Sequence, residues 1–166
     1  MNIEDCWDLY NNFGDDYERY YFDEITGGFV LIHQNHKTTE SELFIAKVLA
    51  QKGGQVKLLS EQAEAGVKTP DAEIDGKICE FKELTEGSQS LGNRVQEGIG
   101  QARKQGATAV YYYINRSDYE LWKINRGIRQ AFFWDKQQRI KEISLLFNDG
   151  TLETISREEW ENGKYF

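Results

Sequence analysis

The sequence has a single proline, two cysteines and two histidines, and it lacks any long hydrophobic run. Cys6 and Cys79 are too few for a disulfide framework, which excludes the small disulfide-stapled class and favours a reducing compartment. No apolar stretch approaches the roughly 20 residues that a membrane helix needs, and the acidic N-terminus does not have the pattern of a signal peptide. We therefore expect a globular protein without a membrane partner.

The remaining composition is that of one globular domain. The 166 residues are 39% hydrophobic, which is enough to build a substantial core. We expect a single domain over 1–166, with an N-terminal extension at 1–38, a core at 39–115, and a C-terminal helix with strands at 116–166. We find no internal repeat and no low-complexity linker.

Charge is unevenly distributed along the chain. The net charge of −8 argues against a generic nucleic-acid binder, which presents a basic surface. The stretch from Lys77 to Lys141 nevertheless holds 12 Lys and Arg against 7 Asp and Glu, a local charge of +5. This asymmetry favours a phosphate-bearing partner for that part of the chain.

The hydrophobic pattern predicts a mixed α/β fold. Thr39-Glu40-Ser41-Glu42 fits a capping box, and it opens a helix whose apolar stripe ends at Gly53-Gly54. The other expected elements are, in chain order, a short helix and an irregular segment over 1–22, strands at 29–33 and 55–60, a loop at 61–68, a hairpin at 68–84, a helix at 90–106, a strand at 108–115, a helix at 118–138, and two strands joined by a turn over 142–156. This order predicts a mixed central β-sheet flanked by helices.

The hairpin carries three charged residues on one face. Asp75-Gly76 tolerates positive φ at both positions and closes a tight two-residue turn. That register places Asp71 directly opposite Glu80, with Cβ atoms about 5 Å apart, and it places Lys82 on the same face two residues further on. The opposite face, which we expect to be core, holds Ala72, Ile74, Cys79 and Phe81.

Carboxylates opposed across a strand pair repel each other, so a compensating cation is expected. Two carboxylates at this spacing suit Mg²⁺, which takes oxygen ligands and keeps several waters. The alternative is a half-solvated hairpin in which Asp71 and Glu80 are only hydrated and Lys82 is a surface lysine.

The helix at 90–106 and the aromatic residues after it carry weaker signals. Gly98 and Gly100 each cost a helix about 1 kcal/mol, which indicates that the helix backbone approaches a strand or a ligand closely. Residues 111–113, all tyrosine, and Trp122 could stack on RNA bases. We expect them in the core instead.

The two histidines, His33 and His36, are three residues apart. No cysteine and no third histidine lies near them in the sequence. We therefore expect ordinary loop histidines rather than a metal-binding pair.

Pro70-Asp71, followed after eight residues by Glu80-Phe81-Lys82, resembles the motif of the PD-(D/E)XK nuclease superfamily. The order of the elements around it resembles that superfamily's αβββαβ, restriction-endonuclease-like core. More narrowly, the segments ESELFIAKVLAQKGGQVKLL and IGQARKQGATAVYYYI are similar to the tRNA-nuclease C-terminal domain of CdiA-type contact-dependent inhibition toxins. The resemblance covers Glu40 to Asn115 well and the C-terminal part more loosely, whereas we match residues 1–28 to no family.

The resemblance implies a role for each motif residue. Asp71 and Glu80, with the backbone carbonyl of Phe81, would ligate Mg²⁺ or Mn²⁺, and Lys82 would orient or help deprotonate the attacking water. Glu42 would add an acid to the metal shell, unless it only completes the capping box. Further implied residues are Gln105 near the active site, and Arg94, Arg103 and Lys104 as substrate-binding cations, unless these form a solvated basic surface.

The implied activity is that of a metal-dependent nuclease, with tRNA favoured over DNA. It would act in the cytoplasm after delivery from a larger secreted protein, and a cognate immunity protein would neutralise it. Two alternatives stay open: a DNA-cleaving or phage-encoded intracellular nuclease, and a catalytically inactive nucleic-acid or protein binding module on the same fold. A glycosidase gives Lys82 no role, and its inverting form needs acids about 6.5–9.5 Å apart.

Overall fold

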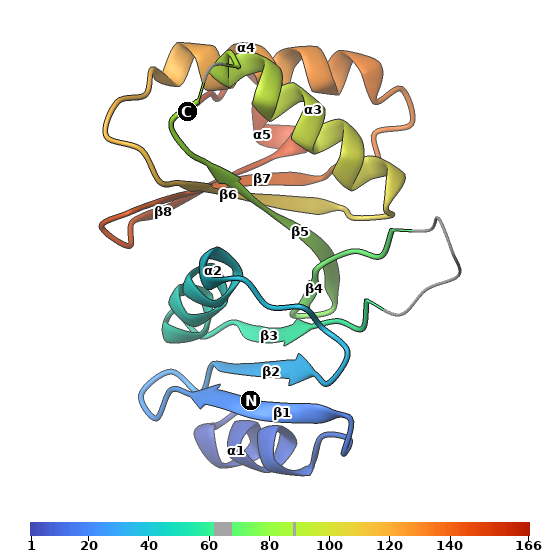
Figure 1. The fold of residues 1–166 in the computed structure, drawn as a ribbon, viewed down its shortest axis with the longest axis vertical. Coiled ribbons are helices and arrows are strands. Elements are labelled where there is room, and N and C mark those ends of the chain that lie inside the picture. The colour runs from blue at the N-terminus through green and yellow to red at the C-terminus, as the bar shows by residue number, and fades with distance from the viewer. Residues whose placement is uncertain (62–67, 88) are drawn as a thin grey trace. The chain divides into compact units, whose positions relative to one another are not determined.

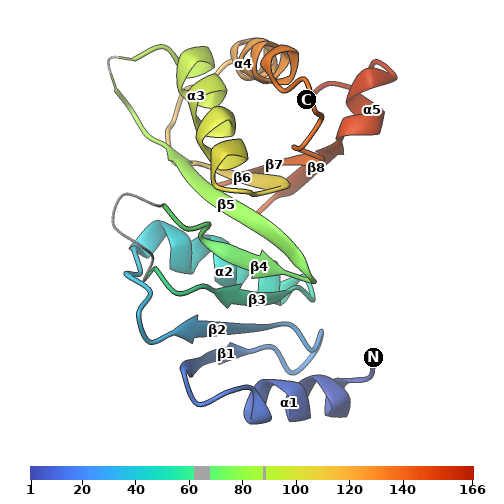
Figure 2. The ribbon, with the colours of Figure 1, turned by 90° about the vertical axis from the view of Figure 1, so that its right-hand side faces the viewer.

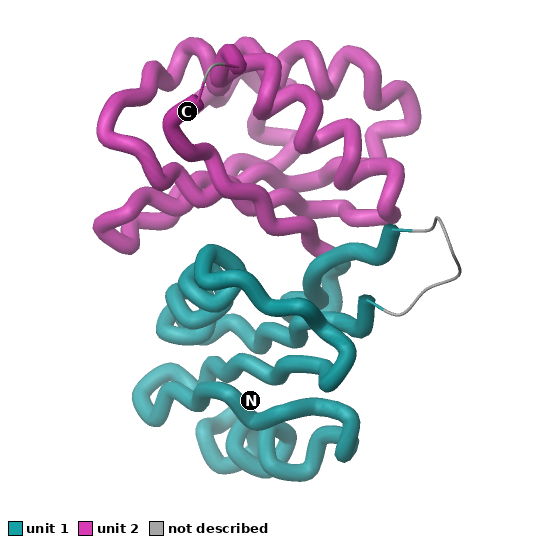
Figure 3. Tube along the Cα trace, in the orientation of Figure 1, with its two compact units in different colours: residues 1–78 teal, residues 79–166 magenta. Residues whose placement is uncertain are grey.

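The computed structural model describes residues 1–61, 68–87 and 89–166, so most of the loop expected at 61–68 lies outside the described residues. The chain forms two compact units, residues 1–78 and residues 79–166, which we call unit 1 and unit 2 (Figure 3). Each unit has its own strands and helices. The expected organisation as a single domain stays a prediction.

Unit 1 is a mixed sheet with two helices among its described residues (Figure 1). Helix α1 contacts β1, and α2 connects β2 to its parallel neighbour β3 and contacts both strands. The pairs β1–β2 and β3–β4 are antiparallel. The bounds are α1 Ile3–Asn12, β1 Tyr17–Phe22, β2 Phe29–His33, α2 Glu40–Gln51, β3 Gln55–Leu58 and β4 Ala72–Ile74.

Unit 2 contains most of β5 and all later elements. Strand β5 pairs in parallel with β6, β6 pairs in parallel with β7, and β8 pairs antiparallel with β7. Figures 1 and 2 show α3 and α4 side by side over one face of this sheet. The bounds are β5 Lys77–Leu84, α3 Leu91–Lys104, β6 Ala109–Ile114, α4 Leu121–Trp134, β7 Glu142–Phe147, β8 Leu152–Ser156 and α5 Arg157–Glu161.

The mixed α/β class predicted from the sequence is confirmed, and local signals explain where the predicted helices begin. The side chains of Thr39 and Ser90 accept backbone N–H bonds at the N-termini of α2 and α3. The expected stripe of α2 is buried at Ala46, Leu49 and Ala50. The elements α2, β3, β4, β5, α3 and β6 follow one another in the predicted αβββαβ order. That they form a restriction-endonuclease-like core stays a prediction.

The tight turn between β4 and β5 is also confirmed. Asp75 has φ 50° and Gly76 has φ 84°, so both residues occupy the left-handed region that a two-residue hairpin turn requires. The expected core face is buried as well, because no member is more than 6% exposed: Ala72, Ile74, Cys79 and Phe81.

Two expectations were wrong. The segment expected to be irregular before residue 22 contains β1, which is fixed by the side chain of Arg19 donating to the backbone carbonyls of Tyr10 and Asn11, each at 3.1 Å. Trp122 is 56% exposed in the first turn of α4 rather than in the core. Of the three tyrosines expected in the core, Tyr112 is fully buried, whereas Tyr111 and Tyr113 are half-buried. Helix α5 was not anticipated.

Candidate active site

In unit 2, β5 presents a buried acid beside a lysine. Glu80 is 2% exposed, and one of its carboxylate oxygens lies 3.9 Å from Nζ of Lys82. The ammonium of Lys82 also donates a hydrogen bond to Oε1 of Gln101 on α3, at 2.8 Å. The alternative of a half-solvated hairpin requires Glu80 to be hydrated. A carboxylate that is only 2% exposed does not fit that alternative.

The position of Gln101 follows from close packing of α3 on β6. A Cβ at Gly98 would lie 2.5 Å from the hydroxyl oxygen of Tyr112, so only glycine allows the helix to approach this far. The Tyr112 hydroxyl donates to the carbonyl of Val95 at 2.6 Å, which ties the strand to the helix. The close approach predicted for Gly98 is therefore confirmed, whereas a Cβ at Gly100 would meet nothing within 4 Å.

Burial also sets the chemistry of Tyr112. Desolvation raises the pKa of its hydroxyl, and the nearby charge of Glu80 adds to the effect. The hydroxyl is therefore a neutral donor that holds the helix. It is not a candidate acid or base at neutral pH.

Asp71 immediately precedes β4 in unit 1. Its backbone carbonyl accepts a hydrogen bond from the N–H of Leu59 at 2.9 Å, which fixes the backbone beside the end of β3. Asp71 belongs to unit 1, whereas Glu80 and Lys82 belong to unit 2. The opposition of the two acids and their shared metal, including the backbone carbonyl of Phe81 as a ligand, stay predictions.

Glu42 lies in the first turn of α2, and its carboxylate has two partners. The backbone N–H of Glu42 donates to Oγ1 of Thr39 at 3.3 Å, which is one half of the predicted capping box. The carboxylate accepts from the Thr39 hydroxyl at 3.1 Å through Oε1, and it binds Nε2 of His36 at 2.6 Å through Oε2. The carboxylate is therefore held in place by a residue outside the helix.

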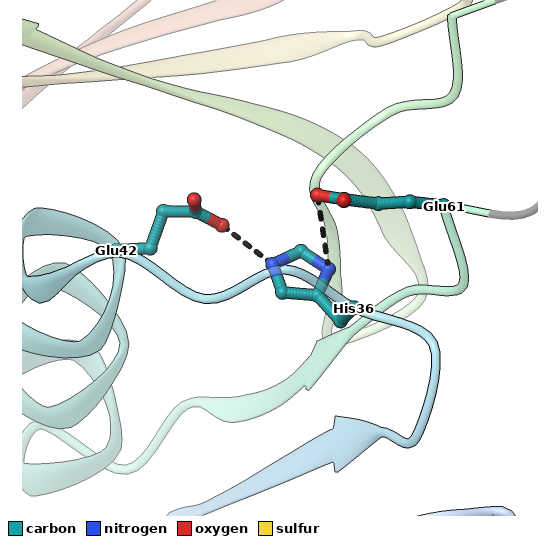
Figure 4. Close-up of side chains that lie close together, drawn as sticks. All are labelled: His36, Glu42 and Glu61. Carbon is teal, nitrogen blue, oxygen red and sulfur yellow. Dashed lines mark hydrogen bonds and ion pairs between the residues drawn. The ribbon is translucent and has the colours of Figure 1, made fainter.

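His36 is the functional candidate of unit 1 that the sequence did not reveal. Its side chain is fully buried, with Nδ1 at 2.6 Å from the carbonyl of Leu59 and Nε2 at the carboxylate of Glu42. Figure 4 shows Glu61 near the other ring nitrogen, where its Oε1 lies 3.8 Å from Nδ1. His33 does not join the cluster. It accepts the N–H of Asn35 instead.

The cluster of His36, Glu42 and Glu61 is a group whose side chains could hold a metal ion. The observed geometry favours a proton instead, since each ring nitrogen faces its own acceptor and an imidazolium can donate to both. Burial alone would lower the pKa of His36, but hydrogen bonds to Glu42 and the Leu59 carbonyl, together with the two nearby carboxylates, raise it. His36 is therefore best described as a cationic clamp on Glu42.

The predicted site residues of α3 are spread along the helix. Gln105 caps its C-terminus, and Oε1 of Gln105 is buried without a hydrogen-bond partner among the described residues. Arg94 donates to the carbonyls of Thr85 and Glu83 and so ties the helix to the end of β5. Gln101 is the glutamine that contacts Lys82, so the implied role of Gln105 stays a prediction.

Arg103 and Lys104 lie in the last turn of α3. Arg103 is half-buried, and its Nη1 donates to the backbone carbonyl of Trp134 at the end of α4, at 2.8 Å. Lys104 is exposed. Gln101, Arg103, Lys104 and Trp134 share the lining of one hollow of about 420 Å³ between the two helices.

A comparison with protein-family models matches residues 68–152 to the contact-dependent growth inhibition CdiA C-terminal domain. The matched stretch includes Asp71, Glu80, Lys82 and Gln101, but not Glu42. No match was found among curated protein sequences. A solved structure of a CdiA-CT/CdiI toxin and immunity complex from Burkholderia pseudomallei aligns with 16% sequence identity and a TM-score of 0.48, covering 69% of this chain and 81% of that one.

Proposed function

The chain belongs to the family of contact-dependent growth inhibition CdiA C-terminal domains, and we propose that this toxin domain is a metal-dependent nuclease of the PD-(D/E)XK type that cleaves tRNA. The observation that carries the proposal is the group formed by Glu80, Lys82 and Gln101. A buried carboxylate can help to hold a cation, and an ammonium beside it, held in place by an amide, can stabilise charge on a phosphate, so the group suits phosphodiester hydrolysis.

The donor set fits Mg²⁺ or Mn²⁺. Glu80 is buried to 2% exposure, and its carboxylate forms an ion pair with Lys82 at 3.9 Å, so this acid already lies beside a cation. The carboxylates of Asp71 and Glu80 and the carbonyl of Phe81 would hold the ion through oxygen atoms alone, which is the preference of hard cations. A bound ion of this kind polarises a phosphoryl oxygen and lowers the pKa of a coordinated water.

Lys82 supplies the positive charge that the chain itself brings to the scissile phosphate. One N–H of its ammonium is committed to Gln101, which fixes the direction of the other two. They remain to bind a phosphate oxygen or to orient the attacking water. Preorganisation of this kind acts in the transition state, because the donor is already in place when charge develops.

Glu42 would complete the acidic group under this proposal. His36 and Thr39 each bind one of its oxygens, so the orientation of the carboxylate is set before any ion arrives. Residues that hydrogen-bond to metal ligands orient those ligands, and their loss typically lowers metal affinity or activity 10–100-fold.

tRNA is proposed as the substrate because the segments over Glu40 to Asn115 resemble tRNA nucleases of contact-dependent inhibition. The family places such domains at the C-terminal end of a larger protein, from which this one would be delivered to the cytoplasm of a target cell. No helix in the described ranges is long and apolar enough to cross a membrane. A cell that produces a nuclease active on its own tRNA needs an immunity protein, which we propose as the cognate partner.

The experiment is a single-turnover cleavage assay on total tRNA and on plasmid DNA, with Mg²⁺ or with EDTA. We expect Lys82→Ala to lower the rate at least about 100-fold, in the range found when a single preorganised donor is removed. Lys77→Ala removes an exposed lysine from the same strand and should stay within about twofold of wild type. Lys82→Arg should recover only part of the rate, because a guanidinium keeps the charge but not the ability to release a proton.

Two results would contradict the proposal. Cleavage of tRNA at the wild-type rate by folded Lys82→Ala would remove the lysine from the chemistry. Undiminished cleavage in EDTA would remove the metal. Preferential cleavage of plasmid DNA would keep the nuclease but replace the substrate.

A further inference from the structure

The C-terminal ends of α3 and α4 form a surface that carries an exposed indole among cations. Trp134 is 56% exposed, and two hollows of about 420 Å³ and 300 Å³ both include it in their lining. Ligand-sized pockets begin at roughly 300 Å³. Both hollows are therefore large enough to accept a nucleotide-sized group.

Four basic side chains line these hollows: Arg103 and Lys104 from α3, and Lys136 and Arg139 from the segment after α4. Two acids line them as well. Asp135 is 2% exposed and its carboxylate binds the guanidinium of Arg157, so its charge is already neutralised. Glu97 accepts a hydrogen bond from Gln89 at 2.9 Å and is the acid that stays exposed. The surface is therefore strongly positive in a protein whose net charge is −8.

The neighbouring rings of Phe133 and Trp134 differ in their contacts with cations. Nζ of Lys136 lies 3.9 Å from the ring centroid of Phe133, so a cation occupies that face. Phe133 and Trp134 contact each other in a T-shaped arrangement with centroids 5.6 Å apart. Arg103 holds the backbone beneath it by donating to the Trp134 carbonyl at 2.8 Å. The backbone of Trp134 is therefore held in place, and its indole is more than half exposed to a stacking partner.

The larger hollow and the proposed active site share Gln101. Gln101 is part of its lining and accepts the hydrogen bond from Lys82. An RNA strand that places a phosphate at Lys82 can continue along α3, past Gln101, to Arg103 and Trp134. All of these residues belong to unit 2.

From this arrangement, and resting on the proposed nuclease function, we propose that Trp134 is a stacking platform for an unpaired base of the RNA substrate. The flanking cations Arg103, Lys104, Lys136 and Arg139 bind the adjoining phosphates. Proteins that hold single-stranded nucleic acid combine an aromatic platform with a basic groove in this way. Basic residues in the last turn of a helix are also stabilised by the helix dipole, so the cations alone would not indicate RNA. The exposed indole that lines both hollows is the feature that indicates a stacked base.

Trp122 provides a matched control on the same helix. It is equally exposed, at 56%, but lies in the first turn of α4. The hollow beside it measures only about 100 Å³. Glu120 binds both the indole N–H of Trp122 and, at 2.9 Å, the ammonium of Lys123, which lowers the local positive charge. A base stacked on Trp122 would gain little.

The test is an equilibrium binding titration in EDTA, where metal-dependent cleavage is suppressed, with a labelled tRNA transcript and a labelled oligouridylate. Trp134→Ala should weaken binding of both probes roughly 5- to 150-fold, the range that corresponds to the loss of one stacked base. Trp134→Phe should recover most of the affinity, and Trp122→Ala should change it less than about twofold. Lys136→Ala should reduce the salt dependence of oligouridylate binding, with a log–log slope smaller by roughly 0.7.

Thermal melting of each variant checks that the exposed substitutions leave the fold intact. Unchanged RNA affinity in folded Trp134→Ala, or equal losses in Trp134→Ala and Trp122→Ala, would overturn the platform. If RNA binding is unchanged while a purified immunity protein loses affinity for Trp134→Ala, the surface belongs to that partner and the RNA proposal is wrong. Cleavage by the wild-type protein is measured separately. If Trp134 does not bind RNA but the protein cleaves tRNA, the nuclease proposal is retained and the stacking proposal is wrong. If the protein is inactive but binds RNA through Trp134, the stacking proposal is retained.

Discussion

The buried ion pair between Asp135 and Arg157 should hold the segment that follows α4, and the structure allows its contribution to be worked out. Asp135 is 2% exposed, and its carboxylate accepts hydrogen bonds from Arg157 at 3.1 Å, from the N–H of Ile140 at 2.9 Å and from the N–H of Arg139 at 3.1 Å. Arg157 also donates to the carbonyl of Phe132 at 3.2 Å. One acid thus organises the backbone between α4 and β7.

Arg157→Met keeps the bulk of the side chain but leaves the carboxylate buried without its cation. We expect a loss of about 3–5 kcal/mol in the free energy of unfolding. Asp135→Asn combined with Arg157→Met should cost less than the sum of the single changes, by about 0.5–3 kcal/mol, because the two residues share one interaction. Glu161→Gln is the control. It removes the exposed partner that Arg157 contacts at 3.2 Å, and it should cost under about 1 kcal/mol.

The same pair predicts a dependence on pH. Burial opposes ionisation of Asp135, but hydrogen bonds from Ile140 and Arg139 and the charge of Arg157 outweigh it, so the pKa of the carboxyl lies below its ordinary value. A lowered pKa stabilises the fold fully above the unfolded value of about 3.9, and this stabilisation is lost as the pH falls through the folded value. Acid should therefore destabilise wild type more than Asp135→Asn.

Urea unfolding of wild type and variants, at neutral pH and in acid, measures these effects. A loss below about 1 kcal/mol in Arg157→Met at neutral pH would show that the ion pair does not hold this segment. Equal sensitivity to acid in Asp135→Asn and wild type would show that the Asp135 carboxyl is not the group that titrates. Thermal melting of Trp134→Ala and of Arg157→Met, measured side by side, shows whether the stability comes from the ion pair or from the surface around Trp134.

Three further predictions concern the site and its supports. Gly98→Ala should destabilise the protein by about 1–3 kcal/mol in urea unfolding, because its Cβ would lie 2.5 Å from the Tyr112 hydroxyl. Gly100→Ala should stabilise the protein by up to about 1 kcal/mol, because its Cβ would meet nothing. Equal effects of the two substitutions would refute the close packing of α3 on β6. Mg²⁺ or Mn²⁺ should raise the melting temperature of wild type but not of Asp71→Asn, and equal shifts in the two proteins would place the ion elsewhere. His36→Ala should cost about 3–5 kcal/mol, since it strips a buried cation from two acceptors, and a loss below about 1 kcal/mol in urea unfolding would show that His36 is no clamp.

Local chemistry explains why much of the fold was predictable. The cap at Thr39 and the turn at Asp75-Gly76 act over two to four residues, and each has the predicted conformation. The cap at Ser90, which was not predicted, acts over the same short range. Strand β1 was not predicted because its cause is not local. Its Arg19 reaches back to the carbonyls at the end of α1, and no pattern of period two announces such a contact.

The residues of the candidate site also fall into those with local causes, which the sequence predicts, and those with long-range contacts, which it does not. The motif residues Glu80 and Lys82 could be selected from the sequence because their alternation on one strand follows from the turn. Gln101 could not be selected, since its contact with Lys82 spans 19 residues and depends on how closely α3 approaches β6. His36 was dismissed because its acceptors, the Glu42 carboxylate and the Leu59 carbonyl, lie 6 and 23 residues away.

Strand order within each unit has a consequence for how the chain acquires its structure. In unit 1 and again in unit 2, each strand pairs with the next strand along the sequence. Loops that close between neighbouring segments lose little entropy, and folding is faster when contacts are local in sequence. Each unit can thus form these pairs from strands of its own sequence, although its parallel pairs must first close over an intervening helix. For a domain carried at the end of a larger protein, the strand pairs within each unit then need no strand from the rest of that protein.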